Sequence, residues 1–255
     1  MVKKIFIQNR KGLKLAINLS ISEDNDKLIF LLHGLGARKD YPHMKVMEDI
    51  FFESGYNVVN IDATNSNNES DKSEEGITFT GHYNDLEDVI SWAKTQSFYK
   101  EPFALAGQSM GAVACTLYAS KNPDIVNSLT LANFSWIDGK IESQNNRRRK
   151  EILEKGYYIQ TSKSTGKSFV IKQNYLDDLR QYNLTDDIKQ IKAKTSVIIG
   201  LADSEYHINN GHVLYNLLTC PKQLVELPCV PHDLANTPED KAKFESALRK
   251  ILAKN

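Results

Sequence analysis

Short apolar runs alternate with amphipathic stretches along most of the chain. The apolar or β-branched runs predict β-strands at residues 3–8, 13–20, 27–32, 57–61, 103–106, 126–131, 195–200 and 223–227. Stretches with helical periodicity predict helices at residues 41–53, 83–94, 110–121, 209–218 and 238–252. Leu86, Val89, Ile90 and Ala93 show an explicit i, i+3, i+4, i+7 stripe. This alternation predicts an α/β protein with a mostly parallel sheet that helices cover on both faces.

The regular alternation fails between residues 136 and 185. This stretch combines a polar helix, a segment at 157–172 that turns at residues 164–167, and a second helix at 175–182. We predict that residues 136–185 are a small cap inserted into one core, which residues 1–135 and 186–255 build. A second interruption at 65–76 is polar and predicts a solvated loop.

A serine with glycines on either side follows one predicted strand and precedes a helix rich in small residues. The segment Gly107-Gln108-Ser109-Met110-Gly111 has the spacing of a nucleophile turn. Such a turn strains the serine backbone, and glycines two positions away remove Cβ atoms that would collide there. The hydroxyl then stands at a helix N-terminus, which favours developing negative charge. We predict that Ser109 is a nucleophile rather than an incidental capping serine.

A serine hydroxyl needs a base, and the base needs an orienting acid. His232 is the candidate base, because it follows the last predicted strand at the sheet edge where Ser109 emerges. The other histidines fit less well: His33 belongs to a turn after a strand, His43 and His82 occupy helix starts, and His207 and His212 follow the acid segment. Asp203 is the candidate acid at the end of a strand, with Glu205 as the alternative and helix capping as the non-catalytic interpretation.

The turn His33-Gly34-Leu35-Gly36 follows the strand predicted at residues 27–32. A flexible turn at this place can direct the backbone N–H of Leu35 toward Ser109. The N–H of Met110 would approach from the opposite side. Two preorganised donors are what a tetrahedral oxyanion requires. We therefore predict that Leu35 and Met110 form an oxyanion hole.

Charge and composition limit the classes of partner that the chain is expected to bind. The chain has 32 lysine and arginine residues and 32 aspartate and glutamate residues. It therefore lacks the net positive charge that attracts nucleic acid or anionic membranes, and a small molecule is the expected partner. The basic cluster Arg147-Arg148-Arg149-Lys150 is interpreted as solvated. The three cysteines are scattered and match no disulfide or zinc pattern, so we expect no cofactor, no metal and a reducing, cytoplasmic location. An export signal and a membrane span are not expected, and no oligomeric state is predicted.

With these residues assembled, the chain resembles the α/β-hydrolase superfamily. Within it, the chain looks like compact carboxylesterases related to cinnamoyl/feruloyl esterases, monoacylglycerol lipases and serine aminopeptidase-type hydrolases. The resemblance is carried by residues 31–36, 55–59, 107–111 and 197–203 and by His232. It implies an eight-stranded, mostly parallel sheet with an antiparallel second strand and a cap after strand six. The serine, acid, histidine order agrees with this family, and the resemblance implies the roles given above for Ser109, Asp203, His232, Leu35 and Met110.

The sequence departs from this family at three places. Gln108 replaces a common histidine beside the nucleophile, Cys229-Val230-Pro231 replaces a glycine-rich turn, and residues 65–68 replace an arginine-glycine-histidine-glycine turn. These departures remove no reacting group.

The expected activity is hydrolysis of a carboxylic ester of a small or medium acyl group through an acyl-enzyme on Ser109. Thioesters and small amides or peptides are alternatives, because one triad serves all of these acyl transfers. A non-catalytic binding protein with the same fold is the alternative from another class. Ser109 excludes haloalkane or epoxide cleavage, which needs a carboxylate nucleophile at this turn. Four aromatic residues of the cap are expected to limit the substrate pocket: Trp136, Tyr157, Tyr158 and Phe169.

Overall fold

The computed structural model describes residues 2–66, 68–139, 146–161 and 168–253, without the side chains of residues 146–149. The strands are β1 (Val2–Gln8), β2 (Lys14–Ser20), β3 (Lys27–Leu32), β4 (Tyr56–Asp62), β5 (Phe103–Gln108), β6 (Val126–Ala132), β7 (Tyr157–Thr161), β8 (Ser168–Lys172), β9 (Lys194–Gly200) and β10 (Lys222–Leu227). The helices are α1 (Pro42–Glu53), α2 (Phe79–Ala93), α3 (Met110–Lys121), α4 (Asn146–Lys155), α5 (Gln173–Leu179), α6 (Thr185–Lys189), α7 (Glu205–Leu217) and α8 (Pro238–Leu252). The turn expected at 164–167 and the side chains of Arg147, Arg148 and Arg149 lie outside the described residues.

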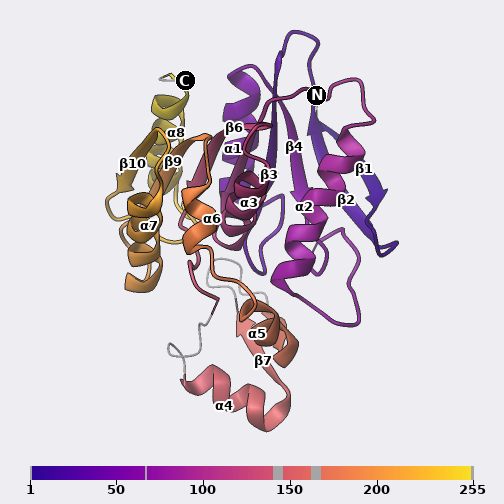
Figure 1. Cartoon of the computed structure of the whole chain (residues 1–255), viewed down its shortest axis with the longest axis vertical. Coiled ribbons are helices and arrows are strands. Elements are labelled where there is room, and N and C mark those ends of the chain that lie inside the picture. Colours follow the sequence, from indigo (N-terminus) through magenta and orange to yellow (C-terminus); the bar gives the residue numbers. More distant parts are fainter. Residues whose placement is uncertain (1, 67, 140–145, 162–167, 254–255) are drawn as a thin grey trace.

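The main sheet has eight strands in the order β1-β2-β4-β3-β5-β6-β9-β10. Strand β2 pairs antiparallel with both of its neighbours, whereas every pairing from β4 to β10 is parallel. Figure 1 shows this twisted sheet with β1 at one edge and β10 at the other. The predicted fold class is confirmed. The carboxyl ends of the parallel strands all lie at the same end of the sheet. Open α/β sheets bind ligands just beyond these carboxyl ends.

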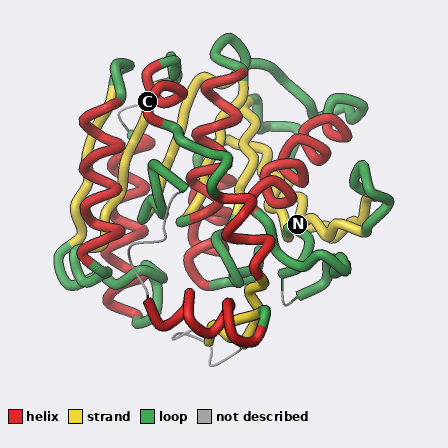
Figure 2. Tube along the Cα trace, turned by 60° about the horizontal axis from the view of Figure 1, so that its bottom comes forward, coloured by secondary structure: helices red, strands yellow, loops and turns green. Residues whose placement is uncertain are grey.

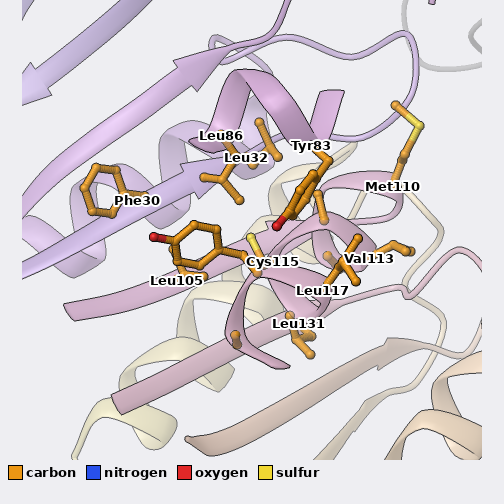
Figure 3. Packing of buried hydrophobic residues seen from close by; sticks show 14 of the residues in the cluster. Phe30, Leu32, Tyr83, Leu86, Leu105, Met110, Val113, Cys115, Leu117 and Leu131 are labelled. Carbon is orange, nitrogen blue, oxygen red and sulfur yellow. The ribbon is translucent and has the colours of Figure 1, made fainter. Parts of the chain in front are cut away.

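Helices cover both faces of the sheet, as the continuous apolar runs of the central strands require (Figure 2). In β3 the side chains alternate: Phe30 and Leu32 belong to one core cluster, while Ile29 and Leu31 belong to the other. The first cluster packs the sheet against α2, α3 and α7, and Figure 3 shows its part around α3. The second packs the sheet against α1 and α8. The site-bearing turns therefore start from strands that are fixed on both faces.

Two helices begin four residues before their predicted starts. Helix α2 begins at Phe79 because the Thr78 hydroxyl accepts a hydrogen bond from the N–H of Gly81. Helix α7 begins at Glu205 because the Ser204 hydroxyl accepts one from the N–H of His207. Each cap satisfies a donor that the first helical turn leaves without a partner. The earlier start of α7 brings residues 205–208 into a rigid helix directly after Asp203.

Between β6 and β9 the chain leaves the main sheet. The insertion contains α4, the antiparallel β7–β8 pair, α5 and α6. Its two ends run side by side, since the N–H of Leu184 donates to the Ile137 carbonyl and the N–H of Gly139 donates to the Tyr182 carbonyl, each at 2.9 Å. In Figure 1 α4, β7 and α5 lie below the sheet. No helix among the described residues is long and apolar enough to cross a membrane.

Candidate active site

Ser109 lies at the junction of β5 and α3 with a strained backbone. Its φ of 55° and ψ of −119° place a non-glycine residue where L-residues rarely occur. A Cβ on Gly111 would lie 2.1 Å from the Leu32 carbonyl oxygen, and one on Gly107 would lie 2.5 Å from the Gly111 carbonyl carbon. The backbone around Ser109 is thus so closely packed that both glycines are required. The turn holds the Ser109 hydroxyl at the N-terminus of α3.

His232 and Asp203 lie on two neighbouring turns at the carboxyl ends of the parallel strands. Nδ1 of His232 is 2.5 Å from Oδ2 of Asp203, whose side chain is only 6% exposed. Burial by itself would raise the pKa of Asp203, but hydrogen bonds from His207 and His232 outweigh it and hold that pKa well below its usual value. Glu205 is exposed at the first position of α7. Of the two acids proposed from sequence, the structure brings Asp203 to the histidine.

The turn that carries His232 is fixed by side chains from β5 and the end of β6. The side-chain amide of Asn133 donates to the His232 carbonyl at 2.8 Å, while its oxygen accepts from the Gly200 N–H at 2.7 Å. Nε2 of Gln108 also donates to the His232 carbonyl, at 3.2 Å. These bonds tie the end of β9 and the His232 turn together. They orient the backbone of His232 and leave its ring free to face the cavity.

Two buried histidines fix the turn that contains Leu35. The N–H of Ala63 donates to Nε2 of His33, so the His33 proton is on Nδ1 and is donated to the Gly34 carbonyl at 2.8 Å. Nε2 of His82 donates to the His33 carbonyl at 2.8 Å. Burial lowers the pKa of His33 and lowers that of His82 to about 3, so both rings stay neutral. This neutral network holds a glycine turn against Ser109, since a Cβ on Gly34 would lie 2.8 Å from the Ser109 Cβ.

A cavity of about 830 Å³ lies between the main sheet and the insertion. Ser109, His232, Asp203 and Leu35 line it from the core. Met110 is buried directly behind Ser109, and as the first residue of α3 its N–H has no partner within the helix. The insertion closes the other side with aromatic and aliphatic side chains: Ile152, Tyr158, Phe169, Ile171, Tyr175 and Leu176.

Comparison with known proteins identifies the fold. The profile of a family described as "alpha/beta hydrolase fold" matches residues 27–142. No curated protein sequence matches the chain. Among solved structures, the chain is similar to Est1E from Butyrivibrio proteoclasticus with bound ferulic acid, at 17% identity, a TM-score of 0.82 and coverage of 98% of both chains. It is also similar to mouse alpha/beta hydrolase domain-containing protein 10, at 16% identity, a TM-score of 0.79 and coverage of 99% of both chains. The chain therefore has the α/β-hydrolase fold.

A third similar structure is the esterase domain of a Rhodothermus marinus protein. The identity is 17%, the TM-score is 0.68, and the match covers 99% of this chain and 98% of that one. At such identities these likenesses establish the shared α/β-hydrolase fold. They leave the substrate to be argued from the residues of this chain.

Two of the aromatic residues expected to line the pocket do not lie along it. Trp136 is completely buried at the root of the insertion, where its ring packs on Phe79 at 4.8 Å between centroids. Tyr157 is 42% exposed, because alternate side chains of β7 point to opposite sides and Tyr158 takes the inward one. Tyr158 and Phe169 do line the cavity. The expectation for Trp136 and Tyr157 is therefore corrected.

Sequence reasoning missed two residues of the site. The sequence pattern presents His207 only as a residue that follows the acid, yet its Nδ1 lies 3.0 Å from Oδ1 of Asp203. The signal for it was the i, i+4 spacing from Asp203 across the capping residue Ser204. Asn133 carried no local signal, because its partners Gly200 and His232 lie far away in the sequence. Only the α/β-hydrolase fold brings them together.

Proposed function

We propose that the chain is a serine hydrolase that cleaves carboxylic esters of small or medium acyl groups through an acyl-enzyme on Ser109. The observation that carries this proposal is the shared cavity: strained Ser109 and His232 both line it, and Nδ1 of His232 is 2.5 Å from Asp203, whose side chain is nearly buried. A weak nucleophile, a base and an orienting carboxylate in one site are the parts of nucleophilic acyl transfer.

In the proposed reaction Oγ of Ser109 attacks the acyl carbonyl carbon, and Nε2 of His232 accepts the hydroxyl proton. The N–H groups of Leu35 and Met110 stabilise the oxyanion of the tetrahedral intermediate. Nε2 then gives the proton to the departing alcohol, which leaves an acyl group on Ser109. A water molecule then attacks the acyl-enzyme in the same way, with His232 as the base, and releases the carboxylic acid. Asp203 keeps the His232 proton on Nδ1, and the low pKa of Asp203 keeps it ionised while it does so.

The walls of the cavity favour an organic acyl or aryl group of moderate size. Its volume of about 830 Å³ lies within the range of small-molecule sites. The insertion contributes Tyr158, Phe169 and Tyr175, whose rings suit an apolar or aromatic substituent. Est1E, a similar structure, is known with bound ferulic acid. Esters of hydroxycinnamic acids therefore belong among the first substrates to be tested.

A substrate panel tests the proposal and its alternatives. It contains p-nitrophenyl esters of increasing acyl length, a feruloyl ester, acyl-CoA thioesters and aminoacyl anilides. We expect the highest kcat/KM for an ester. A thioester or anilide that is turned over faster than every ester would transfer the proposal to that class. No turnover of any member, together with no reaction of Ser109 with a fluorophosphonate, would favour a non-catalytic binding protein.

Tyr158 and Tyr157 form a matched pair for testing the role of the insertion. We expect Tyr158→Ala to change the ratio of kcat/KM between short and long acyl esters by about 10-fold or more, since a few methylene groups in an apolar pocket are worth that much. Tyr157→Ala should leave the ratio unchanged, because this side chain faces away from the cavity. The measurement is kcat/KM for each ester. Equal losses on every ester in Tyr158→Ala, with the ranking preserved, would mean that Tyr158 supports the reacting groups instead.

Removal of metal ions should not lower ester turnover, because no proposed step uses a metal. The measurement is kcat on an activated ester before and after dialysis against EDTA. Loss of activity in EDTA, with recovery on addition of a metal ion, would contradict the mechanism.

A further inference from the structure

Asp203 interacts with two histidines at once. Nδ1 of His232 lies 2.5 Å from Oδ2, and Nδ1 of His207 lies 3.0 Å from Oδ1. The two rings stack with centroids 4.3 Å apart and planes 30° from parallel. Among the described residues these three side chains form a set whose donor atoms all lie within 4.8 Å of one another. Sequence spacing did not reveal this set, because His232 joins it from a separate turn.

The set is open on one side. The Asp203 side chain is nearly buried, whereas those of His207 and His232 are 24% and 30% exposed. All three line the large cavity. An ion in the cavity can therefore reach the two imidazoles and the Asp203 carboxylate. A water molecule from the cavity can complete its coordination.

The donor types and separations suit zinc. Two imidazoles and one carboxylate with an open fourth position are a common zinc environment, with bonds of about 2.0–2.2 Å. A tetrahedral ion with such bonds keeps its ligand atoms ~3.3 Å apart. The His207 Nδ1 and Asp203 Oδ1 atoms, 3.0 Å apart, are close to this spacing. Rotation of the two partly exposed imidazoles can bring the other ligand atoms to this spacing.

We propose that Asp203, His207 and His232 bind Zn²⁺, and that the bound ion reversibly inhibits the enzyme. Binding depends only on the three ligands, while inhibition rests on the proposed hydrolase function. In the active form His232 carries its proton on Nδ1 and uses the Nε2 lone pair as base. Zinc takes the Nδ1 position of both histidines, and each displaced proton moves to Nε2 of the same ring, so both rings stay neutral and the proton count is unchanged. The lone pair that would accept the Ser109 proton is then occupied.

Calorimetric titration of Ser109→Ala protein with ZnCl₂, after removal of metal by chelator, measures binding without turnover. We expect one equivalent of Zn²⁺ to bind. His207→Gln and His207→Phe, each combined with Ser109→Ala, should weaken binding by at least about 10-fold, because even loss of a residue that only orients a metal ligand costs about that much. The phenylalanine variant keeps an aromatic ring against His232 but has no ligand atom. It therefore distinguishes the loss of a zinc ligand from the loss of packing. His212→Gln is the matched control on the same helix, because His212 pairs with Glu226 outside the cavity, and its zinc affinity should not change.

Ester turnover of the protein with native Ser109 is then measured against ZnCl₂ and MgCl₂. We expect zinc to inhibit and EDTA to restore full activity, whereas magnesium, which prefers oxygen ligands, has no effect. Zinc binding that persists in both His207 variants, or is lost in Cys229→Ser, would assign the ion to another site and overturn the proposal. Turnover without any zinc binding would also overturn it and leave the hydrolase intact. His207-dependent binding in a chain that hydrolyses nothing would refute the hydrolase and the inhibition but leave the zinc site.

Discussion

Replacement of Ser109 by alanine should lower ester turnover by at least about 10⁴-fold and leave the fold intact. The loss follows from the proposed chemistry, because no other group in the mechanism can form the acyl-enzyme. Stability should hold because alanine lacks only the hydroxyl oxygen and has the same Cβ, so the strained turn between β5 and α3 sees no larger side chain. The measurements are kcat on a p-nitrophenyl ester, covalent labelling by a fluorophosphonate, and the thermal melting curve.

Ser120→Ala is the control for this experiment. Ser120 lies near the other end of α3, where its hydroxyl donates to the Leu117 carbonyl. We expect this variant to keep its activity and its label. Undiminished turnover or labelling of Ser109→Ala would show that the nucleophile is another residue. Loss of the cooperative melting transition would instead mean that Ser109 is needed for folding.

Much of the fold could be predicted from the sequence, because burial leaves a direct mark on the pattern of side chains. The run of residues 28–32 is apolar because β3 is covered on both faces, and the stripe from Leu86 to Ala93 is apolar because one side of α2 faces the sheet. Helix starts were less predictable. Thr78 and Ser204 are polar residues that resemble loop residues until their hydrogen bonds to the following turn are seen.

Some residues of the candidate site could be predicted from the sequence, and others could not. Ser109 could be found because its strained turn requires nearby glycines, and that requirement appears in the sequence itself. The contacts of Asn133 and the stacking of His207 on His232 join segments that are distant in the sequence, so no local pattern indicates them. For Trp136 the sequence showed an aromatic residue in the insertion but not which surface it faces. That depends on packing against Phe79.

The charge of Asp203 gives a pH-dependent stability that can be separated from its role in turnover. Its native pKa is lower than the ordinary aspartate value of about 3.9, so its ionised form stabilises the native state above that pH. This contribution is lost as the pH falls through the lower native pKa. Asp203→Asn should therefore lower the melting temperature at pH 7, and the difference from the unmodified chain should shrink toward pH ~2.5.

The effect of Asp203→Asn on turnover should be far larger than that of Glu205→Gln. The buried carboxylate of Asp203 holds the His232 proton on Nδ1, and an amide in its place allows the wrong tautomer, which costs roughly 10³–10⁴ in kcat. Glu205 is an exposed first-turn residue of α7, where its negative charge interacts favourably with the helix dipole. Loss of this charge should change kcat by less than about 3-fold. Both variants are compared on one activated ester at pH 7. A large loss in Glu205→Gln with near-normal Asp203→Asn would transfer the role to Glu205, and small losses in both would remove the carboxylate from the mechanism.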